Sequence, residues 1–266
     1  MKYILDHDLH IHSMISQCSS DPEQTAERIM QYAKSLGLKQ IALTDHFWDE
    51  NVPGASSWYA KYHKFSDLVK ALPLPKDDEV EFLFGCETDM DKNGVIGLSR
   101  EKFDEFDFIV VPTTHLHMKG FTVDECDYGN PVRLAQLWVE RFDRLLDADL
   151  PFGKVGIAHL STACIAHENN LYFDVLKILP DDEVYRLFEK TAQIGLGIEI
   201  NASDIAVSDK DIDTVLHPFR IAKECGCKFY YGSDAHKPRD FDGYKYFDRA
   251  VDILSLTEDD KFIIKR

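Results

Sequence analysis

The chain has 266 residues, of which 44% are hydrophobic and 29% charged, proportions that are ordinary for a globular protein with a sizeable core. At this length one α/β barrel of about 250 residues accounts for the whole chain without a second domain. The formal net charge of −17 argues against nucleic acid as a bulk partner, because nucleic-acid-binding proteins usually carry a basic stripe.

Short apolar runs alternate with helical patterns along the chain. After a first run that ends at residues 8–12, Asp21 and Pro22 are expected to open an amphipathic helix as N-cap and first helical residue, and Gly37 to end it. Further strands are expected at residues 40–43, 82–84, 108–111, 155–158, 197–200 and 228–231. Further helices are expected near residues 131–146, 181–193 and 211–224. Apolar strands separated by helices indicate a parallel sheet covered by helices.

Metal-binding side chains lie at the ends of these runs or in the loops that follow them. In a parallel barrel the C-terminal ends of all strands lie at one face, where their loops build the active site. An open doubly wound sheet binds only around its switch point, so ligands from every strand would not converge there. We therefore predict a single barrel domain over residues 1–266, with a metal site at the C-terminal ends of its strands.

The candidate ligands are imidazoles and carboxylates, which bind borderline and hard divalent cations. His10 and His12 are separated by one residue, so on an extended strand they point to the same side and can hold one ion. Glu87 can bridge two metals through its two oxygens. The other candidates are His46, His115, His159, Asp234 and His236. One such histidine would usually be structural, but this many at successive strand ends indicate a multinuclear metal site.

Four segments make the sequence resemble the polymerase and histidinol phosphatase (PHP) superfamily. They are residues 8–13, residues 44–46, the region of Glu87 and His115, and residues 232–236. The resemblance extends over nearly the whole chain and implies a distorted (β/α)7 barrel with two or three divalent metal ions. Zinc, manganese and iron all suit this mixture of ligands.

The resemblance also implies which residues hold each ion. The implied sets are His10, His12, Glu87 and Asp234 for a first metal, Glu87, His115 and His159 for a second, and His46 and His236 for a third. Family members commonly add a His or Asp to the third site from the loop after residue 12. Here that loop offers Gln17, Cys18 or Asp21, so the third site is either weakened or completed by Cys18 or Asp21. The segment 199–201 is expected to orient ligands or to line the pocket.

The implied function is metal-dependent hydrolysis of a small phosphorylated metabolite, of the histidinol-phosphatase type found in histidine biosynthesis. A metal-activated hydroxide is expected to attack the phosphorus of a phosphate monoester in line, with Glu87 and Asp234 holding the metals that turnover needs. His236 or Asp45 could manage protons, and Asp45 is better suited to orient a ligand. The alternatives are a nucleotide or oligonucleotide phosphoesterase and a non-catalytic, metal-binding regulatory barrel. A homo-oligomer is compatible with the sequence.

Substrate contacts are expected from long loops on the ligand side. The loop from residue 47 to about residue 78 is rich in aromatic side chains, Trp48 and Trp58 among them, which is typical of a substrate wall or of a loop anchored onto the barrel. Trp48 is the tryptophan predicted to contact substrate. Lys119 and Arg239 are the preferred phosphate-binding cations over Arg133 and Lys237. Each of these four could equally be a solvated surface charge. His117 is expected to face substrate or solvent.

Localisation is inferred from what the sequence lacks. The N-terminus has no basic start followed by an apolar run, as a signal peptide requires, and no apolar stretch approaches the roughly 20 residues that span a membrane. The six cysteines show no framework spacing. We therefore expect a cytoplasmic protein with reduced thiols and no membrane partner.

Overall fold

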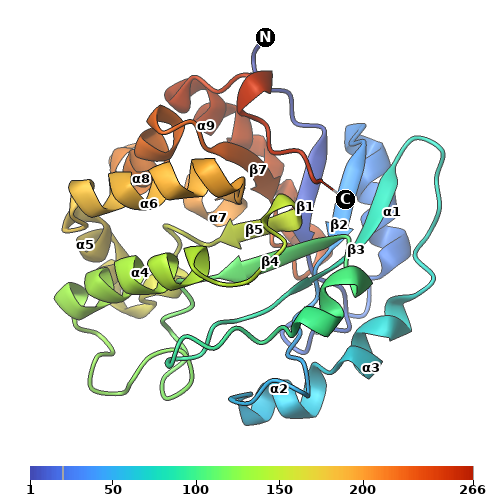
Figure 1. Ribbon diagram of the computed structural model, residues 1–266. Coiled ribbons are helices and arrows are strands. Elements are labelled where there is room, and N and C mark those ends of the chain that lie inside the picture. The colour runs from blue at the N-terminus through green and yellow to red at the C-terminus, as the bar shows by residue number, and fades with distance from the viewer. Residues whose placement is uncertain (20, 266) are drawn as a thin grey trace.

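The computed structural model describes residues 1–19 and 21–265. Within these residues the main sheet consists of seven parallel strands that pair in chain order, as Figure 1 shows. The strands are β1 His7–Ile11, β2 Gln40–Leu43, β3 Glu81–Glu87, β4 Phe108–Pro112, β5 Val155–Ala158, β6 Gly197–Asn201 and β7 Lys228–Gly232. The strands predicted from the apolar runs are confirmed.

The sheet closes between the C-terminal end of β1 and the segment just after β7. The Asp234 N–H donates to the His10 carbonyl at 2.7 Å, and the His12 N–H donates to the Ala235 carbonyl at 3.1 Å. Closure therefore lies at the C-terminal face, where it brings the residues after β7 against His10 and His12. The predicted distorted (β/α)7 barrel is confirmed.

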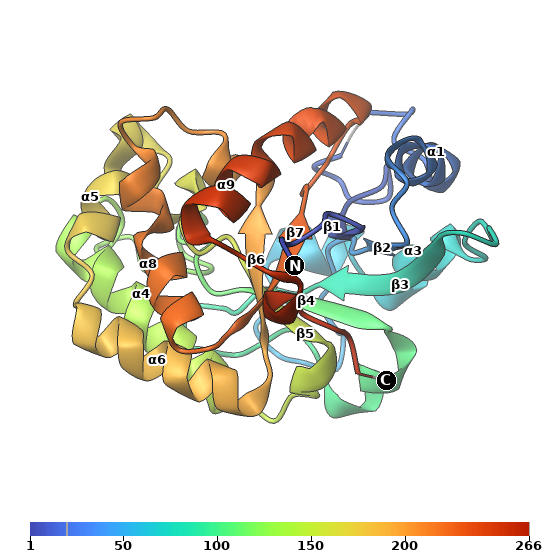
Figure 2. The same cartoon turned by 90° about the horizontal axis from the view of Figure 1, so that it is seen from above.

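Helices surround the barrel on its outside. They are α1 Ala26–Leu36, α2 Ser57–Tyr62, α3 Phe65–Leu68, α4 Pro131–Leu146, α5 Leu171–Lys177, α6 Asp181–Ile194, α7 Ala202–Ile205, α8 Ile212–Glu224 and α9 Phe247–Leu254. Helices α4, α6 and α8 lie together on one side of the barrel and α1 on the opposite side (Figure 1, Figure 2). None of the helices in the described part of the chain is long and apolar enough to cross a membrane.

The predicted start of α1 was wrong. Its N-cap is Thr25, whose hydroxyl accepts the Arg28 N–H at 3.2 Å. Asp21 instead shapes a turn, in which its carboxylate accepts the Glu23 N–H at 2.9 Å. An Asp-Pro pair suits a turn as well as a helix start, and here the turn is formed. The predicted end is confirmed, because Gly37 is the C-cap with a φ of 69°.

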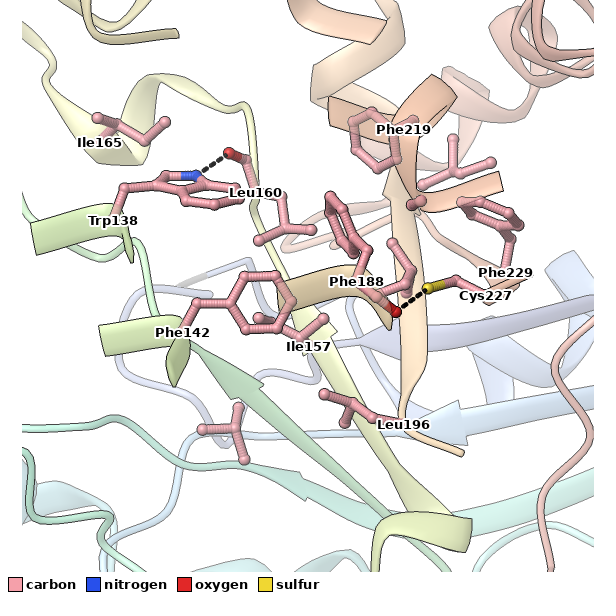
Figure 3. Close-up of a cluster of buried hydrophobic side chains, with 14 of the residues drawn as sticks. Trp138, Phe142, Ile157, Leu160, Ile165, Phe188, Leu196, Phe219, Cys227 and Phe229 are labelled. Carbon is pink, nitrogen blue, oxygen red and sulfur yellow. Dashed lines mark hydrogen bonds between the residues drawn. The ribbon is translucent and has the colours of Figure 1, made fainter. Parts of the chain in front are cut away.

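The core between α4, α6, α8 and the sheet is aromatic, and Figure 3 shows Trp138, Phe142, Phe188 and Phe219 in it. Burying each such side chain contributes about 1.5–3 kcal/mol. The Trp138 indole N–H also donates to the Leu160 carbonyl at 2.8 Å. Helix α4 therefore fixes the loop that leaves β5 next to a candidate ligand.

The barrel interior is filled by side chains from the strands and from the C-terminal segment. These residues are Leu9, Ala42, Leu83, Phe108, Val110, Ala158, Tyr230 and Phe262. Phe262 is held there by its backbone N–H, which donates to the Phe229 carbonyl at 2.8 Å. Because this packing fills the barrel below the strand ends, the polar residues gather at the C-terminal face.

Candidate metal centre

A bulge near the end of β1 turns His10, in the strand, and His12, just after it, toward the centre of the barrel. The pairing register with β2 shifts between Asp8 and Ile11, so β1 carries an extra residue at this point. Leu9 consequently packs in the barrel interior, whereas Ile11 packs outside with the residues of α1. A bulge re-aims side chains in this way, and here it directs His10 and His12 to the site.

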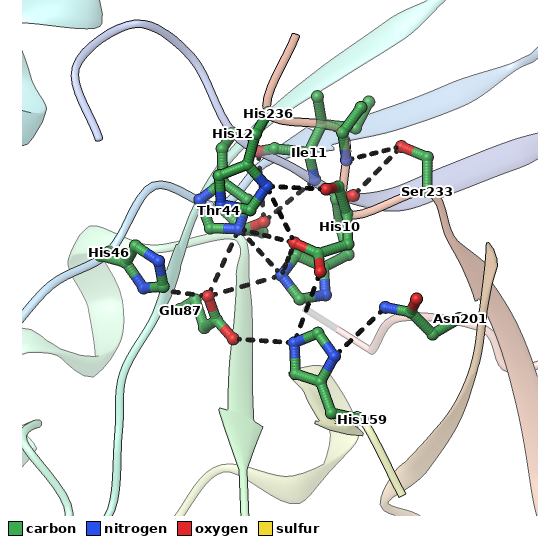
Figure 4. Close-up of polar contacts among 12 residues, drawn as sticks. His10, Ile11, His12, Thr44, His46, Glu87, His159, Asn201, Ser233 and His236 are labelled. Atoms are coloured by element: carbon green, nitrogen blue, oxygen red, sulfur yellow. Dashed lines mark hydrogen bonds and ion pairs between the residues drawn. The ribbon is translucent and has the colours of Figure 1, made fainter. Parts of the chain in front are cut away.

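Glu87 ends β3, is almost fully buried and faces different histidines with its two oxygens (Figure 4). Its Oε2 lies 3.0 Å from His46 Nδ1 and 3.3 Å from His12 Nε2. Its Oε1 lies 3.3 Å from His159 Nε2 and 3.8 Å from His115 Nε2. A carboxylate in this position can bridge two cations.

Asp234 follows β7 and completes the group around β1. Its Oδ1 lies 3.2 Å from His12 Nε2 and 3.5 Å from His10 Nε2, and its Oδ2 lies 3.8 Å from His159 Nε2. Asp234 and His159 have φ values of 52° and 63°, which are rare for residues other than glycine. Such backbone strain costs on the order of 1–3 kcal/mol and is typical of functional sites.

Two buried carboxylates orient the imidazoles from behind. Glu199 Oε1 lies 2.6 Å from His10 Nδ1, and Asp89 Oδ1 lies 2.8 Å from His115 Nδ1. Each contact fixes Nδ1 as the N–H side, so that Nε2 turns its lone pair to the cluster. Glu199 lies in the segment from which orienting contacts were expected, and Asn201 of that segment also contacts His159 Nδ1, at 3.3 Å.

Asp89 is a residue that the sequence analysis missed. The signal was its position two residues after Glu87, which on an extended chain places both side chains on the same side. Tyr59 donates its hydroxyl to Asp89 at 2.6 Å and thereby ties the aromatic loop to the site.

Gly232 lies tightly packed against the contact between Glu199 and His10. A Cβ at this position would lie 2.0 Å from Glu199 Oε1 and 2.7 Å from the His10 Cβ. Only a glycine therefore fits between the carboxylate and the imidazole that it orients.

Asp45 does not reach the centre of the cluster. Its carboxylate accepts the Ser13 N–H at 2.8 Å and the Ser16 hydroxyl at 2.6 Å. Ser16 in turn accepts the His46 N–H at 3.1 Å and lies 3.3 Å from His12 Nδ1. Asp45 therefore acts on the two histidines through the loop after β1.

The charges inside the cluster compensate one another. Burial lowers the pKa of His10, but the carboxylates of Glu199, Glu87 and Asp234 outweigh it and raise that pKa well above its usual value. Burial raises the pKa of Glu87, but His46 and His10 outweigh it and hold that pKa well below its usual value. The carboxylate is thus kept ionised in a buried place, where it can bind a cation.

The cluster leaves polar atoms without hydrogen bonds where a metal would lie. Among the described residues, Glu87 Oε2 and Asp234 Oδ1 are buried and make no hydrogen bond. His10 Nε2 and His12 Nε2 lie only 3.1 Å apart. Buried oxygens and facing imidazole nitrogens of this kind fit divalent cations.

The ligand atoms form several groups in which all atoms lie within 4.8 Å of one another. Those at the centre are His10–His12–Asp234, His10–Glu87–His159, His12–His46–His236 and His115–His159–Cys164. The structure thus brings together all eight predicted metal-binding residues. It also adds His12 to the predicted pair His46 and His236.

Of the three side chains considered to complete the third site, Cys18 is the one that lines the pocket. Its thiol contacts His46. Asp21 lines a neighbouring hollow with Lys237, and Gln17 is exposed.

The pocket above the cluster has a volume of about 400 Å³. It is lined by Cys18, His46, Trp58, Glu87, Asp89, His115, His117, Met118, His159, Cys164, Asp234 and His236. No lysine or arginine appears among these described lining residues. Any anion bound there must be neutralised by metal ions and imidazoles.

The structure brings His117 to the pocket, but not the other predicted substrate contacts. Trp48 is buried away from the pocket lining, and its indole N–H donates to the Val52 carbonyl at 2.9 Å. Lys119 lies over the Tyr128 ring, 3.7 Å from its centroid. The Arg239 side chain is 78% exposed on the surface. Trp58 is the tryptophan that lines the pocket.

Comparison with known proteins gives concordant findings. A model of the PHP domain matches residues 8–203. A probable phosphatase of Caldicellulosiruptor saccharolyticus is 26% identical over 235 residues, which are 87% of this chain and 80% of that protein. The crystal structure of histidinol phosphate phosphatase from Lactococcus lactis, complexed with zinc, L-histidinol and phosphate, superposes with a TM-score of 0.55. That match covers 95% of this chain and 94% of the other at 15% identity, and it supports the barrel fold.

Proposed function

The chain belongs to the PHP domain family, and on that premise we propose that it is a metal-dependent phosphatase that hydrolyses a small phosphate monoester. The observation that carries the proposal is Glu87. It is buried at the base of the pocket and directs each of its oxygens to a different set of imidazoles. Such a bridging carboxylate is what a two-metal hydrolase needs.

Two divalent ions, of zinc, manganese or iron, are assigned to this centre. His10, His12, Glu87 and Asp234 would hold the first, and Glu87, His115 and His159 the second. A third is assigned to His12, His46 and His236, with Cys18 beside His46 as the candidate for the missing ligand. When bound, such ions lower the pKa of water, hold phosphoryl oxygens and offset charge on the leaving oxygen.

The protein groups position and insulate this chemistry. Glu199 and Asp89 hold the His10 and His115 rings in the orientation that presents Nε2. His236 Nδ1 lies 2.8 Å from the carbonyl of Asp234, which leaves Nε2 to bind a cation or to pass a proton to the leaving oxygen. Asp45 keeps His12 and His46 in place through Ser16.

The substrate class follows from the size and charge of the site. A pocket of about 400 Å³ suits a small metabolite. The net charge of −17 and the absence of lysine and arginine from the described lining disfavour a polynucleotide. L-histidinol phosphate is the first substrate to test, since the structurally similar enzyme from Lactococcus lactis holds L-histidinol and phosphate.

The proposal is tested by phosphate release from purified protein prepared without chelator and loaded with zinc, manganese or iron. L-histidinol phosphate is compared with nucleoside monophosphates and with short oligonucleotides. We expect metal-dependent release from a small monoester and little from oligonucleotides. Tight metal binding without release from any ester would favour a regulatory barrel, and preferential cleavage of oligonucleotides would favour the other phosphoesterase class.

A further inference from the structure

A second group of metal-binding side chains lies at the rim of the pocket, outside the three sites assigned above. It consists of His117, in the loop after β4, and of Cys164 and His167, in the loop after β5. Their ligand atoms all lie within 4.8 Å of one another. His117 and Cys164 also line the pocket, so this group opens onto the same space as the main centre.

The two imidazoles of the group are stacked beside the sulfur. The rings of His117 and His167 have centroids 4.4 Å apart and an interplanar angle of 10°. The Cys164 sulfur lies within 4.8 Å of a ring nitrogen of each of them, and it also lies within 4.8 Å of a ring nitrogen of His115. Two parallel imidazoles of the same charge would repel each other if both were protonated, whereas two neutral rings and a thiolate can share one cation.

The backbone of the loop selects the tautomer of His117 that binds metals. His117 Nδ1 lies 3.2 Å from the carbonyl oxygen of Cys164, and a carbonyl oxygen can only accept. Nδ1 therefore carries the N–H, and the lone pair of the neutral ring is on Nε2. Metal-binding histidines are commonly oriented by such a contact to a carbonyl.

The loop that carries Cys164 is held rigidly. The Cys164 N–H donates to the Thr162 hydroxyl at 3.2 Å, and Ile165 beside it is fully buried. The Ser161 hydroxyl donates to Asp204 at 2.9 Å, and the Leu160 carbonyl accepts from Trp138. These contacts hold the backbone that carries Cys164 in place, as a metal site requires.

We propose that His117, Cys164 and His167 bind a further divalent cation, zinc in preference to manganese. Two imidazoles and one thiolate are ligands that suit zinc, and three protein ligands leave a fourth position open to the pocket. Binding transfers the thiol proton to solvent, so the site gains one net positive charge. That charge lies at a rim whose described lining lacks lysine and arginine, where it can hold an anionic group of a substrate.

A different role for Cys164 must be distinguished from this site. Cys164 also forms a group with His115 and His159, so its thiolate could instead be an extra ligand of the second metal of the main centre. The side chain that separates the two arrangements is His167, which belongs only to the rim group.

The test uses the full-length protein stripped of metal and reloaded with cobalt, because a thiolate ligand gives Co²⁺ a charge-transfer absorption in the near ultraviolet. All samples carry Cys18→Ser, so the thiol beside His46 cannot contribute to the signal. We expect the absorption in this background. We expect Cys164→Ser and His167→Ala each to abolish it and to lower the cobalt content by one ion per chain. His217→Ala is the matched control, since His217 is an exposed histidine of α8 that pairs with Asp181.

Two results would overturn the proposal. In the first, the absorption and the cobalt content both survive His167→Ala, which would assign Cys164 to the second metal. In the second, the Cys18→Ser background shows no thiolate absorption at all. The readout does not depend on phosphate release, so this site can fail while the proposed phosphatase function stands, and the reverse also holds.

Discussion

Asp89 orients a candidate metal ligand, His115, from outside the proposed ligand sets. Its carboxylate lies 2.8 Å from His115 Nδ1 and accepts the Tyr59 hydroxyl at 2.6 Å. Asp89→Asn keeps the shape but weakens the contact that orients the ring. We predict a loss of metal affinity of about 10- to 100-fold, measured by competition with a chromophoric chelator. Asp124→Asn, at an exposed carboxylate, is the control, and equal affinities in the two variants would contradict the assigned role.

At this scale the sequence indicates which side chains gather at the site better than it indicates their surroundings. The gathering of the eight candidate ligands could be predicted because each lies near or just after a strand end, where a barrel brings side chains together. Trp48 was predicted as a substrate contact, but Trp58 lines the pocket instead, because which tryptophan faces the pocket depends on how the long loop packs. His167 lies away from any strand end, so no sequence pattern marks it, yet its ligand atom lies within 4.8 Å of those of His117 and Cys164.

Helix α4 connects the core to the segments that carry Asp89 and His115. The buried guanidinium of Arg141 donates to the carbonyls of Met90, Asp91, Thr113 and Thr122 at 2.6–3.0 Å. Burial lowers the pKa of Arg141 to about 10, so it remains charged at neutral pH. It therefore ties the segments around Asp89 and His115 to the helix.

We predict that Arg141→Met lowers the free energy of unfolding by on the order of 3 kcal/mol or more, because it leaves buried carbonyls without donors. Urea unfolding of the metal-free protein measures this change. Arg144→Met, at an exposed position one turn nearer the helix end, should change the value by less than about 0.5 kcal/mol. A similar effect of both substitutions would show that Arg141 does not hold the loops.

The elements themselves were predicted closely, with two instructive exceptions. The alternation of side chains along a strand does not reveal the bulge of β1. His10 and His12 are two residues apart in the sequence whether or not the strand carries an extra residue. The start of α1 was missed because an Asp-Pro pair is compatible with both a turn and a helix start. In both cases contacts from other parts of the chain decide the local structure.

For the whole molecule, an ion-pair group at the N-terminal end of the barrel joins the two ends of the chain. The Lys261 ammonium is buried and lies 3.0 Å from Asp6 Oδ1 and 2.9 Å from Glu258 Oε2. The hydrogen bond from His7 lowers the pKa of Asp6, burial opposes it and Lys261 lowers it further, to about 2. An unperturbed Asp has a pKa of about 3.9, so the folded state favours the ionised form.

This lowered pKa predicts how stability depends on pH. The contribution of Asp6 is present above about pH 4 and is lost as the pH falls from about 4 to about 2. Asp6→Asn should therefore lower the melting temperature at pH 7, with a difference from wild type that narrows over that range. Thermal unfolding of the metal-free protein checks this, with the exposed Asp104→Asn as control. A difference that is independent of pH would contradict it.

The order and closure of the barrel could be expected from strands that alternate with helices and end in ligand-type residues. How deep the interior is filled depends on packing that no sequence pattern specifies. Phe262, which lies beyond the last strand, enters the interior only because the C-terminal segment pairs with Phe229. The whole-chain architecture is therefore more predictable than the lining of its pocket.

The central claim is that Glu87 joins two metal ions in a hydrolytic site, and its most direct test compares Glu87→Gln with Glu81→Gln. The control residue lies at the opposite end of the same strand. Metal content and phosphate release from L-histidinol phosphate are measured on each protein. Residues that only orient a metal ligand typically change activity by up to about 100-fold when they are replaced. We predict that Glu87→Gln loses bound metal and that its turnover falls by more than this, while Glu81→Gln matches wild type. Wild-type metal content and turnover in Glu87→Gln would contradict the account.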